Sequence, residues 1–196
     1  MRNIRTLLPL AVAGINGRNW YDHAGWEIDK VCRMADWCPR RFVGVLAVTS
    51  PRCSVVRNIR IALFAMHHNR LPTGIMRAIH ASYNNFVQTG EIYGQKTSAF
   101  YRALLGCNDS VVLDVWMAYA LGVEQSTFTR QSGRAVANRR IRAVATELGI
   151  TPAQCQASIW TGQRKASGYN YSGFNVFREY SDAVATNFNG ITGISG

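Results

Sequence analysis

Two ionisable residues stand out because their types and surroundings suit covalent chemistry. Lys96 lies in Gly94-Gln95-Lys96-Thr97, where a helix is expected to begin, and it is one of three lysines in a chain with 22 Lys and Arg. Asp114 interrupts an apolar run, Val111-Val112-Leu113-Asp114-Val115-Trp116-Met117. A lysine where arginine is the rule, followed by an acid among hydrophobic residues, indicates amine chemistry beside a buried carboxylate.

Each of these residues also has a simpler structural interpretation. Asp114 could serve only as the N-cap of a helix over Val115–Leu121, because aspartate is a favoured capping residue. Lys96 could contact a phosphate group from the first turn of its helix without any covalent role. Both alternatives stay open from the residues alone.

The net charge indicates a polyanionic partner. The chain has 196 residues, 47% of them hydrophobic, which fits one domain or two small lobes sharing a core. Its net charge is +11 and its pI is about 10.0, and such an excess usually means nucleic acid, although solubility alone is the alternative. The preference for arginine favours phosphate contact, because the guanidinium fork binds phosphate bidentately.

Four arginines lie on a strongly basic helix predicted over residues 131–148. They are Arg134, Arg139, Arg140 and Arg142. They form either a stripe that binds the DNA backbone, which the net charge favours, or a solvated face.

The cysteines argue against a metal or iron–sulfur centre. Their number is odd and no CxxC motif occurs, whereas such centres need closely spaced thiolates. We therefore expect no metal and no cofactor, and reduced, mostly buried thiols in a cytoplasmic protein. His23 and Glu27, four residues apart beside Asp22, could ligate a metal, but no second histidine is near. A solvated helix face is the favoured interpretation.

The N-terminus resembles a short signal peptide, with Arg2 and Arg5 before an apolar run. The run is short and Pro9 interrupts it, so we expect a cytoplasmic protein instead. No segment approaches the ~20 apolar residues that a membrane span requires.

Apolar periodicity and helix-stop signals predict an all-α protein of about eight helices. A Ser50-Pro51 N-cap is expected to open the helix after the buried segment. The helix from Ile75 and the helix from Lys96, joined by Gly90–Gly94, make a candidate helix–hairpin–helix. From Gly162 onward the composition shifts to Gly, Asn, Ser and aromatics, which predicts a surface tail. The expected helices are 19–36, buried 41–49, one after Ser50-Pro51, one from Ile75, Lys96–Leu105, Val115–Leu121, 131–148 and Ala153–Trp160.

The segment Gly94–Met117 resembles the signature of the helix–hairpin–helix DNA glycosylase superfamily. In that family a hairpin ends in Gly-x-Lys-[Thr/Val]-Ala, and an apolar-Val-Asp-[Val/Thr]-His stretch follows. Here the stretches are Gly94-Gln95-Lys96-Thr97-Ser98 and Val112-Leu113-Asp114-Val115-Trp116, with Lys96 and Asp114 18 residues apart, as in the lysine-bearing branch. The second stretch is most similar to the 8-oxoguanine glycosylases, with Trp116 in place of histidine and Ile92 in place of the first hairpin glycine. The wider chain also resembles small phage and bacterial proteins of this fold.

The resemblance implies a two-lobed helical fold with a central cleft. The lobes would comprise residues 1–50 with 130–161, and residues 51–129 with the hairpin near 75–105, followed by a tail over 162–196. It also implies a DNA repair enzyme, a glycosylase with lyase activity, that flips a modified or damaged base out of duplex DNA and excises it. Asp114 would stabilise the sugar cation and Lys96 would attack C1′, with burial and the helix dipole favouring its neutral amine.

The remaining site residues are carried over with this interpretation. Hairpin residues would contact DNA together with the basic helix, and aromatic and amide side chains would line the base pocket. The expected DNA contacts are Gly94, Gln95, Thr97, Arg134, Arg139, Arg140 and Arg142. The expected pocket residues are Tyr83, Asn84, Phe100, Tyr101 and Trp116. We expect a monomer with no membrane or protein partner. A phage enzyme that modifies a base on the same fold, or a non-catalytic DNA-binding module, are the alternatives.

Overall fold

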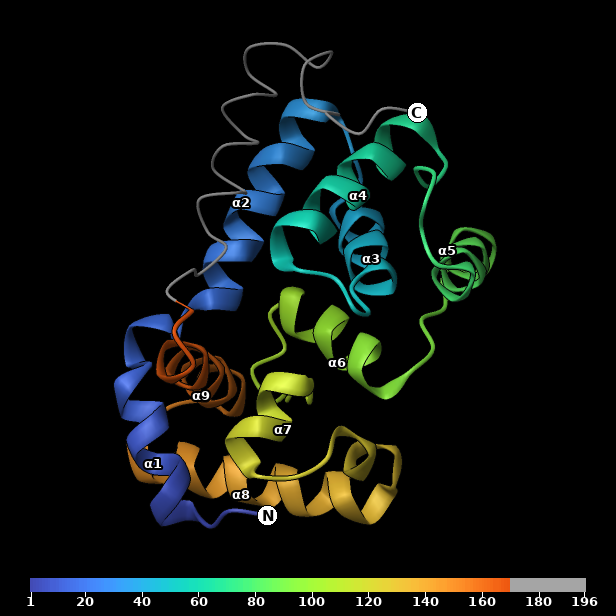
Figure 1. Cartoon of the computed structure of the whole chain (residues 1–196). Coiled ribbons are helices and arrows are strands. Elements are labelled where there is room, and N and C mark those ends of the chain that lie inside the picture. Colours follow the sequence, from blue (N-terminus) through green and yellow to red (C-terminus); the bar gives the residue numbers. More distant parts are fainter. Residues whose placement is uncertain (170–196) are drawn as a thin grey trace. The chain divides into compact units, whose positions relative to one another are not determined.

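The structure, a computed structural model, describes residues 1–169 of the 196, and every regular element in them is helical (Figure 1). The all-α prediction is therefore confirmed. The described residues divide into two compact units, of which unit 1 comprises residues 1–22 and 106–169 and unit 2 comprises residues 23–105. These boundaries differ from the predicted lobes, which divided the chain at residues 50 and 129.

Unit 1 is built around its last helix. The elements of this unit are α1 (Ile4–Ala13), η1 (Ile15–Gly17), α7 (Val115–Leu121), η2 (Gln125–Thr129), α8 (Gln131–Leu148) and α9 (Pro152–Ala166). Helices α1, α7 and α8 all pack on α9, and Figure 1 shows α1 beside it. The core contains Leu7, Met117, Leu121, Ile141 and Ile159, each almost completely buried. The predicted N-cap Thr151 is confirmed, since it forms a capping box with Gln154.

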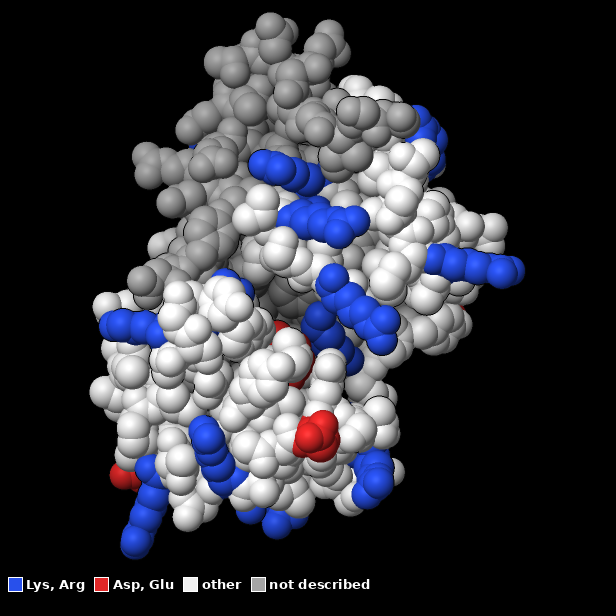
Figure 2. Space-filling view, viewed as in Figure 1, with Lys and Arg blue, Asp and Glu red and all other residues white. Residues whose placement is uncertain are grey.

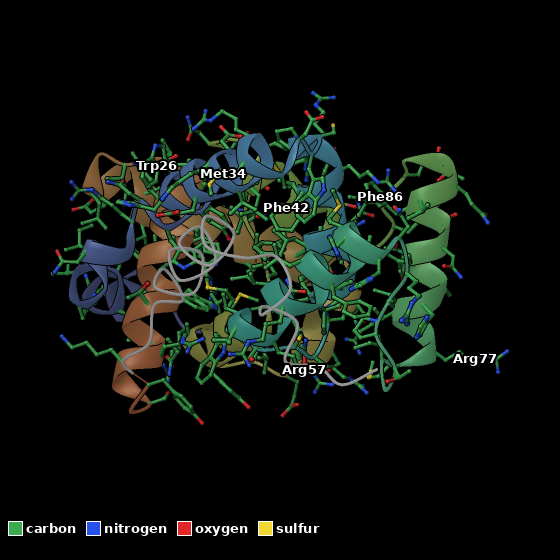
Figure 3. All side chains as sticks on the ribbon, turned by 90° about the horizontal axis from the view of Figure 1, so that it is seen from above. Trp26, Met34, Phe42, Arg57, Arg77 and Phe86 are labelled. Carbon is green, nitrogen blue, oxygen red and sulfur yellow. The ribbon has the colours of Figure 1, made fainter. Side chains whose placement is uncertain are left out.

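Unit 2 is organised around one buried helix. Its elements are α2 (Trp20–Ala35), which begins in unit 1, and α3 (Pro39–Thr49), α4 (Val55–His68), α5 (Arg77–Thr89) and α6 (Gln95–Leu104). Helix α3 packs against α4, α5 and α6, and all of its residues from Phe42 to Thr49 are buried. The apolar run at 41–49 is thus a buried helix, as predicted, and Figure 3 shows Phe42 in the interior of the unit.

A polar bridge inside unit 2 ties α3 to α4. The Asn58 side-chain amide donates to the Leu46 carbonyl at 2.9 Å, and the Thr49 hydroxyl donates to Asn58 Oδ1 at 2.7 Å. Both residues are buried, and these bonds satisfy polar groups that would otherwise destabilise the core.

Two local predictions are wrong. Ser50 ends α3 instead of capping α4, with its hydroxyl donating to the Ala47 carbonyl, and Ser54 is the N-cap of α4. Helix α9 does not stop near Trp160 but continues to Ala166, so Gly162 lies within a helix and not in a tail. Glycine weakened the helical pattern at 162, yet the helix gains more from packing than the glycine costs. The rest of the predicted tail, from residue 170, lies outside the described residues.

Some surface predictions also need correction. Glu27, assigned to a solvated face, is only 9% exposed, while its neighbours Asp22 and His23 are exposed. Of the five cysteines, all free thiols, Cys32 and Cys155 are buried, but Cys38 and Cys107 are exposed. No helix within residues 1–169 is long and apolar enough to cross a membrane.

Candidate active site

Asp114 is fixed at the start of α7 by two N–H donors. The Met117 backbone amide donates to Oδ1 at 3.0 Å, and the Trp160 indole Nε1–H donates to Oδ2 at 3.1 Å. The capping interpretation is therefore confirmed, but it uses only one carboxylate oxygen. The second oxygen is bound by a residue 46 positions away in sequence, which fixes the orientation of a half-buried acid.

An arginine among aromatic rings lies in the same part of unit 1. The Arg164 guanidinium is 4.4 Å from the Trp160 ring, 5.4 Å from the Trp116 ring and 5.8 Å from the Tyr169 ring. Trp116 and Tyr169 also meet edge-to-face at 5.1 Å between ring centroids. Such cation–π contacts hold a planar cation in one place and gain strength where water is excluded.

The electrostatics of Arg164 link it to Asp114. Burial lowers the pKa of the Arg164 guanidinium, and the Asp114 and Tyr169 charges act in the opposite direction. Within residues 1–169 the buried Nε–H of Arg164 has no hydrogen-bond acceptor. An unsatisfied buried donor is costly, so this group is suited to receive an acceptor from a ligand.

Tyr21 extends this polar cluster along the same face of α9. Its hydroxyl donates to Gln156 Oε1 at 2.6 Å, and Gln156 is almost fully buried. Burial, with a smaller contribution from the Asp114 charge, raises the pKa of the Tyr21 hydroxyl well above its usual range, so this group stays a neutral donor. The centroid of the neighbouring Trp20 ring lies 6.2 Å from that of the Trp160 ring, so Trp20 adds a further aromatic ring to the cluster.

Lys96 belongs to unit 2 and lies in the first turn of α6, as predicted. Its side chain is half-buried, and Nζ donates to the Ser50 carbonyl at 3.4 Å, which is long for a hydrogen bond. Arg57 and Lys96 both lie near the Cys53 thiol, where their charges partly offset the effect of burial, which raises the pKa of that thiol. The amine therefore lies beside the α3–α4 loop among other positive charges.

The predicted hairpin turn is shaped by its glycines and by side chains of α6. Gly90 and Gly94 both have positive φ, and Gly94 is the N-cap residue. The Thr97 hydroxyl bonds to the Tyr93 and Gly94 carbonyls, and Ser98 bonds to the Ile92 carbonyl. Thr97 is thus buried inside the turn and not directed to a ligand, while Gln95 is exposed. Because Gly94 has no side-chain acceptor, the first amides of α6 receive no side-chain cap.

The residues predicted to line a base pocket fall into both units. Tyr83 is 4% exposed on the buried face of α5, where it belongs to the core, and Asn84 is exposed. Phe100 and Tyr101 are half-buried on α6. Trp116, in unit 1, is the member of the set that joins the cluster around Asp114 and Arg164.

Most of the predicted arginine stripe on α8 forms contacts within the protein. Arg134 donates to the Phe128 and Thr129 carbonyls, Arg140 to the Met1 and Arg2 carbonyls, and Arg142 to the Asp109 carboxylate and carbonyl. Arg139 is exposed. These guanidinium groups hold loops and the N-terminus against α8, so the helix offers less free charge than its sequence suggests.

The partners of Asp114 on α9 were missed by reasoning from the sequence. Trp160, Arg164 and Gln156 recur every fourth residue along α9 and so lie on one face of it. The signal was present in this spacing, but it is visible only if α9 continues through Gly162. No group of three or more potential metal-ligating side chains occurs among the described residues.

Comparison with known proteins adds a family but no activity. A family model described as a family of unknown function (DUF7178) matches residues 11–167. No curated protein and no solved structure matches the chain.

Proposed function

This chain belongs to the DUF7178 family, and from the geometry of its site we propose that it is a DNA glycosylase with associated lyase activity. The observation that carries the proposal is the setting of Asp114. Its carboxylate is half-buried, is oriented by two N–H donors and adjoins aromatic rings that can stack on a planar ligand. In this proposal the two units correspond to the two lobes of a helix–hairpin–helix glycosylase, with α5 and α6 as the hairpin.

Asp114 supplies electrostatic stabilisation in the first step. The bond from C1′ of the sugar to the base nitrogen breaks, and the base leaves with the electron pair. The positive charge that develops on C1′ and O4′ is stabilised by the carboxylate. Because Met117 and Trp160 already orient the carboxylate, little reorganisation is needed as the charge appears.

Lys96 supplies the nucleophile in the second step. Its neutral amine forms a bond to C1′, the sugar ring opens as O4′ takes a proton, and an iminium results. The iminium acidifies the hydrogen on C2′, and loss of that proton expels the 3′-phosphate by β-elimination. The half-buried position of Lys96 in the first turn of α6 supports this role.

The Arg164 guanidinium and the rings around it, those of Trp116, Trp160 and Tyr169, are suited to hold the extruded base. Bases flipped from a duplex are held by stacking on aromatic rings and by hydrogen bonds to their edges. Trp116 and Trp160 offer the rings, and the buried Arg164 Nε–H offers a donor without an acceptor in the described chain. A base with a carbonyl acceptor would satisfy this donor.

The test is borohydride trapping on duplexes that carry an abasic site or one of a panel of modified bases. Wild type is expected to form a covalent complex, and Lys96→Gln to form at least 100-fold less. Asp114→Asn keeps the helix cap, because Asn and Asp cap about equally well, but it is expected to slow base release by about 100-fold or more. Lys165→Gln, which changes an exposed lysine on α9, is the matched control and should trap like wild type.

The outcomes that contradict the proposal are distinct. Equal trapping by Lys96→Gln removes the nucleophile assignment, and normal excision by Asp114→Asn removes the catalytic aspartate. An intact glycosidic bond with an altered base mass would identify a base-modifying enzyme. Binding without any product across the panel would identify a DNA-binding module.

A further inference from the structure

The positive charge of unit 2 is concentrated in a segment that is nearly free of acid. Between residues 37 and 105 the sole acidic residue is Glu91, against nine basic residues. These are Arg40, Arg41, Arg52, Arg57, Arg60, Arg70, Arg77, Lys96 and Arg102. All eight arginines are exposed. Unneutralised charge at this density destabilises a compact unit by self-repulsion, which a polyanion would relieve.

Four of these cations gather around the start of α4, and we call them the α4 basic face: Arg52, Arg57, Arg60 and Lys96. Arg57 and Arg60 lie three residues apart on α4, so their side chains share one face. That face is opposite the side of α4 that buries Ile59 and Ala62 in the core. Figure 2 shows basic side chains gathered over α4, and Figure 3 shows Arg57 at the periphery of the unit.

The loop before α4 brings the other two cations into this group. Lys96 contacts the Ser50 carbonyl in this loop, and both Lys96 and Arg57 lie near Cys53. Arg52 stands in the same loop with a left-handed φ of 53°, which is uncommon for a residue other than glycine. Arg52 directly precedes Cys53, the residue near which Arg57 and Lys96 lie.

The two basic regions of the chain differ in what their cations do. On α8, the Arg134, Arg140 and Arg142 side chains bind carbonyl groups or a carboxylate of the protein itself. On α4, Arg57 and Arg60 have neither a hydrogen bond nor an ion pair from their side chains within residues 1–169. Free guanidinium forks are the groups that bind phosphate oxygens bidentately.

We propose that the α4 basic face is the surface that binds the sugar–phosphate backbone of duplex DNA. The choice of DNA as the polyanion rests on the proposed function, but the position of the surface rests on the charges and contacts of unit 2. Arg57 and Arg60 each neutralise one phosphate and release its counterions. These contacts depend on salt and not on base sequence.

The test is binding of an undamaged, fluorescein-labelled DNA duplex, measured by anisotropy between 50 and 200 mM salt. Loss of two phosphate contacts is expected to make the slope of log K against log salt less negative by about 2. We therefore expect this shift, with an affinity at least 10-fold lower at 100 mM salt, for Arg57→Ala/Arg60→Ala. The control Arg33→Ala changes an exposed arginine of α2 that lies outside the α4 basic face, and it should keep the wild-type slope. Circular dichroism checks that all variants are folded.

An unchanged slope in the double variant, or an equal change in Arg33→Ala, would overturn the assignment. An RNA duplex of the same length that binds as tightly as the DNA would overturn the choice of DNA. Because undamaged DNA gives no product, this measurement is independent of excision. If trapping fails but the slope changes as expected, the surface stands and the glycosidic chemistry does not.

Discussion

Through its hydrogen bond from Trp160, Asp114 combines a structural role, the helix cap, with the proposed chemical role in one carboxylate. Met117 uses Oδ1 in a helix cap, which is a local contact across three residues. Trp160 uses Oδ2 from a helix that begins 38 residues later in the chain. Removing the indole N–H would keep the helix cap at Oδ1 and take away the Trp160 donor to Oδ2.

Trp160→Phe is expected to lower the free energy of unfolding by about 1.5–3 kcal/mol, the usual range for a hydrogen bond to a charged group. The phenyl ring keeps most of the packing against Trp20 and Arg164. Urea unfolding followed by circular dichroism measures the loss. Trp26→Phe, at a 60% exposed position, is the control and should change stability by less than about 0.5 kcal/mol. Equal effects of both changes would show that the Asp114 bond contributes nothing.

At the scale of elements, α1 and α9 approach so closely that their backbones meet. A Cβ built on Gly162 would overlap the Leu10 carbonyl oxygen, and one on Gly14 would overlap the Ser158 carbonyl oxygen. Glycine is required at both positions because no side chain fits between the helices. The same approach sets α9, and with it Trp160 and Arg164, against the rest of unit 1.

Gly162→Ala is therefore expected to destabilise the protein by about 1–3 kcal/mol, since extra volume in a packed interior forces the backbone to shift. Gly25→Ala is the matched control within helix α2, because its Cβ would lie 3.6 Å from the nearest atom, the Leu104 carbonyl oxygen. That change should be neutral or stabilise by up to about 1 kcal/mol, as alanine favours helix over glycine. Thermal unfolding of the two variants decides the point, and a stabilised Gly162→Ala protein would refute the close contact.

Across the whole molecule, each unit buries one thiol whose proton is held by the fold. Burial raises the pKa of Cys32, in unit 2, and of Cys155, in unit 1, from 9.0 to about 12. Between these values the folded chain keeps protons that the unfolded chain loses. The contribution of these thiols to the free energy of unfolding is therefore fully present below pH 9 and is lost as the pH rises toward 12.

Each thiol is expected to contribute a fall of up to about 1.4 kcal/mol per pH unit within that window. Urea unfolding in reducing buffer between pH 7.5 and 10.5 measures the slope. Cys155→Ala should make the slope of the unfolding free energy against pH shallower by the contribution of one thiol. This holds whatever stability the substitution removes at neutral pH. Cys38→Ala, which removes an exposed thiol, should leave the slope as in wild type. If the slope of Cys155→Ala matches wild type, the buried thiol does not govern the alkaline loss.

The sequence by itself determined the features that depend on neighbours along the chain. Apolar periodicity predicted the buried helix at α3, glycine stops predicted the ends of α7 and α8, and Asp114 and Thr151 were placed at helix starts. These features follow from backbone hydrogen bonding and side-chain spacing within a few residues. The prediction that Ser50 caps α4 was wrong because Ser54, four residues later, is a second serine able to cap the helix, and it is the N-cap.

Only the tertiary structure decided which residues surround Asp114 and which cations are free. Trp160 reaches Asp114 because α7 packs on α9. The Arg140 guanidinium binds the Met1 carbonyl because the N-terminus packs against α8. Helix propensity carries no information on such contacts, since they join residues between 46 and 139 positions apart. The spacing of Lys96 and Asp114 was therefore visible in the chain, while their surroundings depended on helix packing.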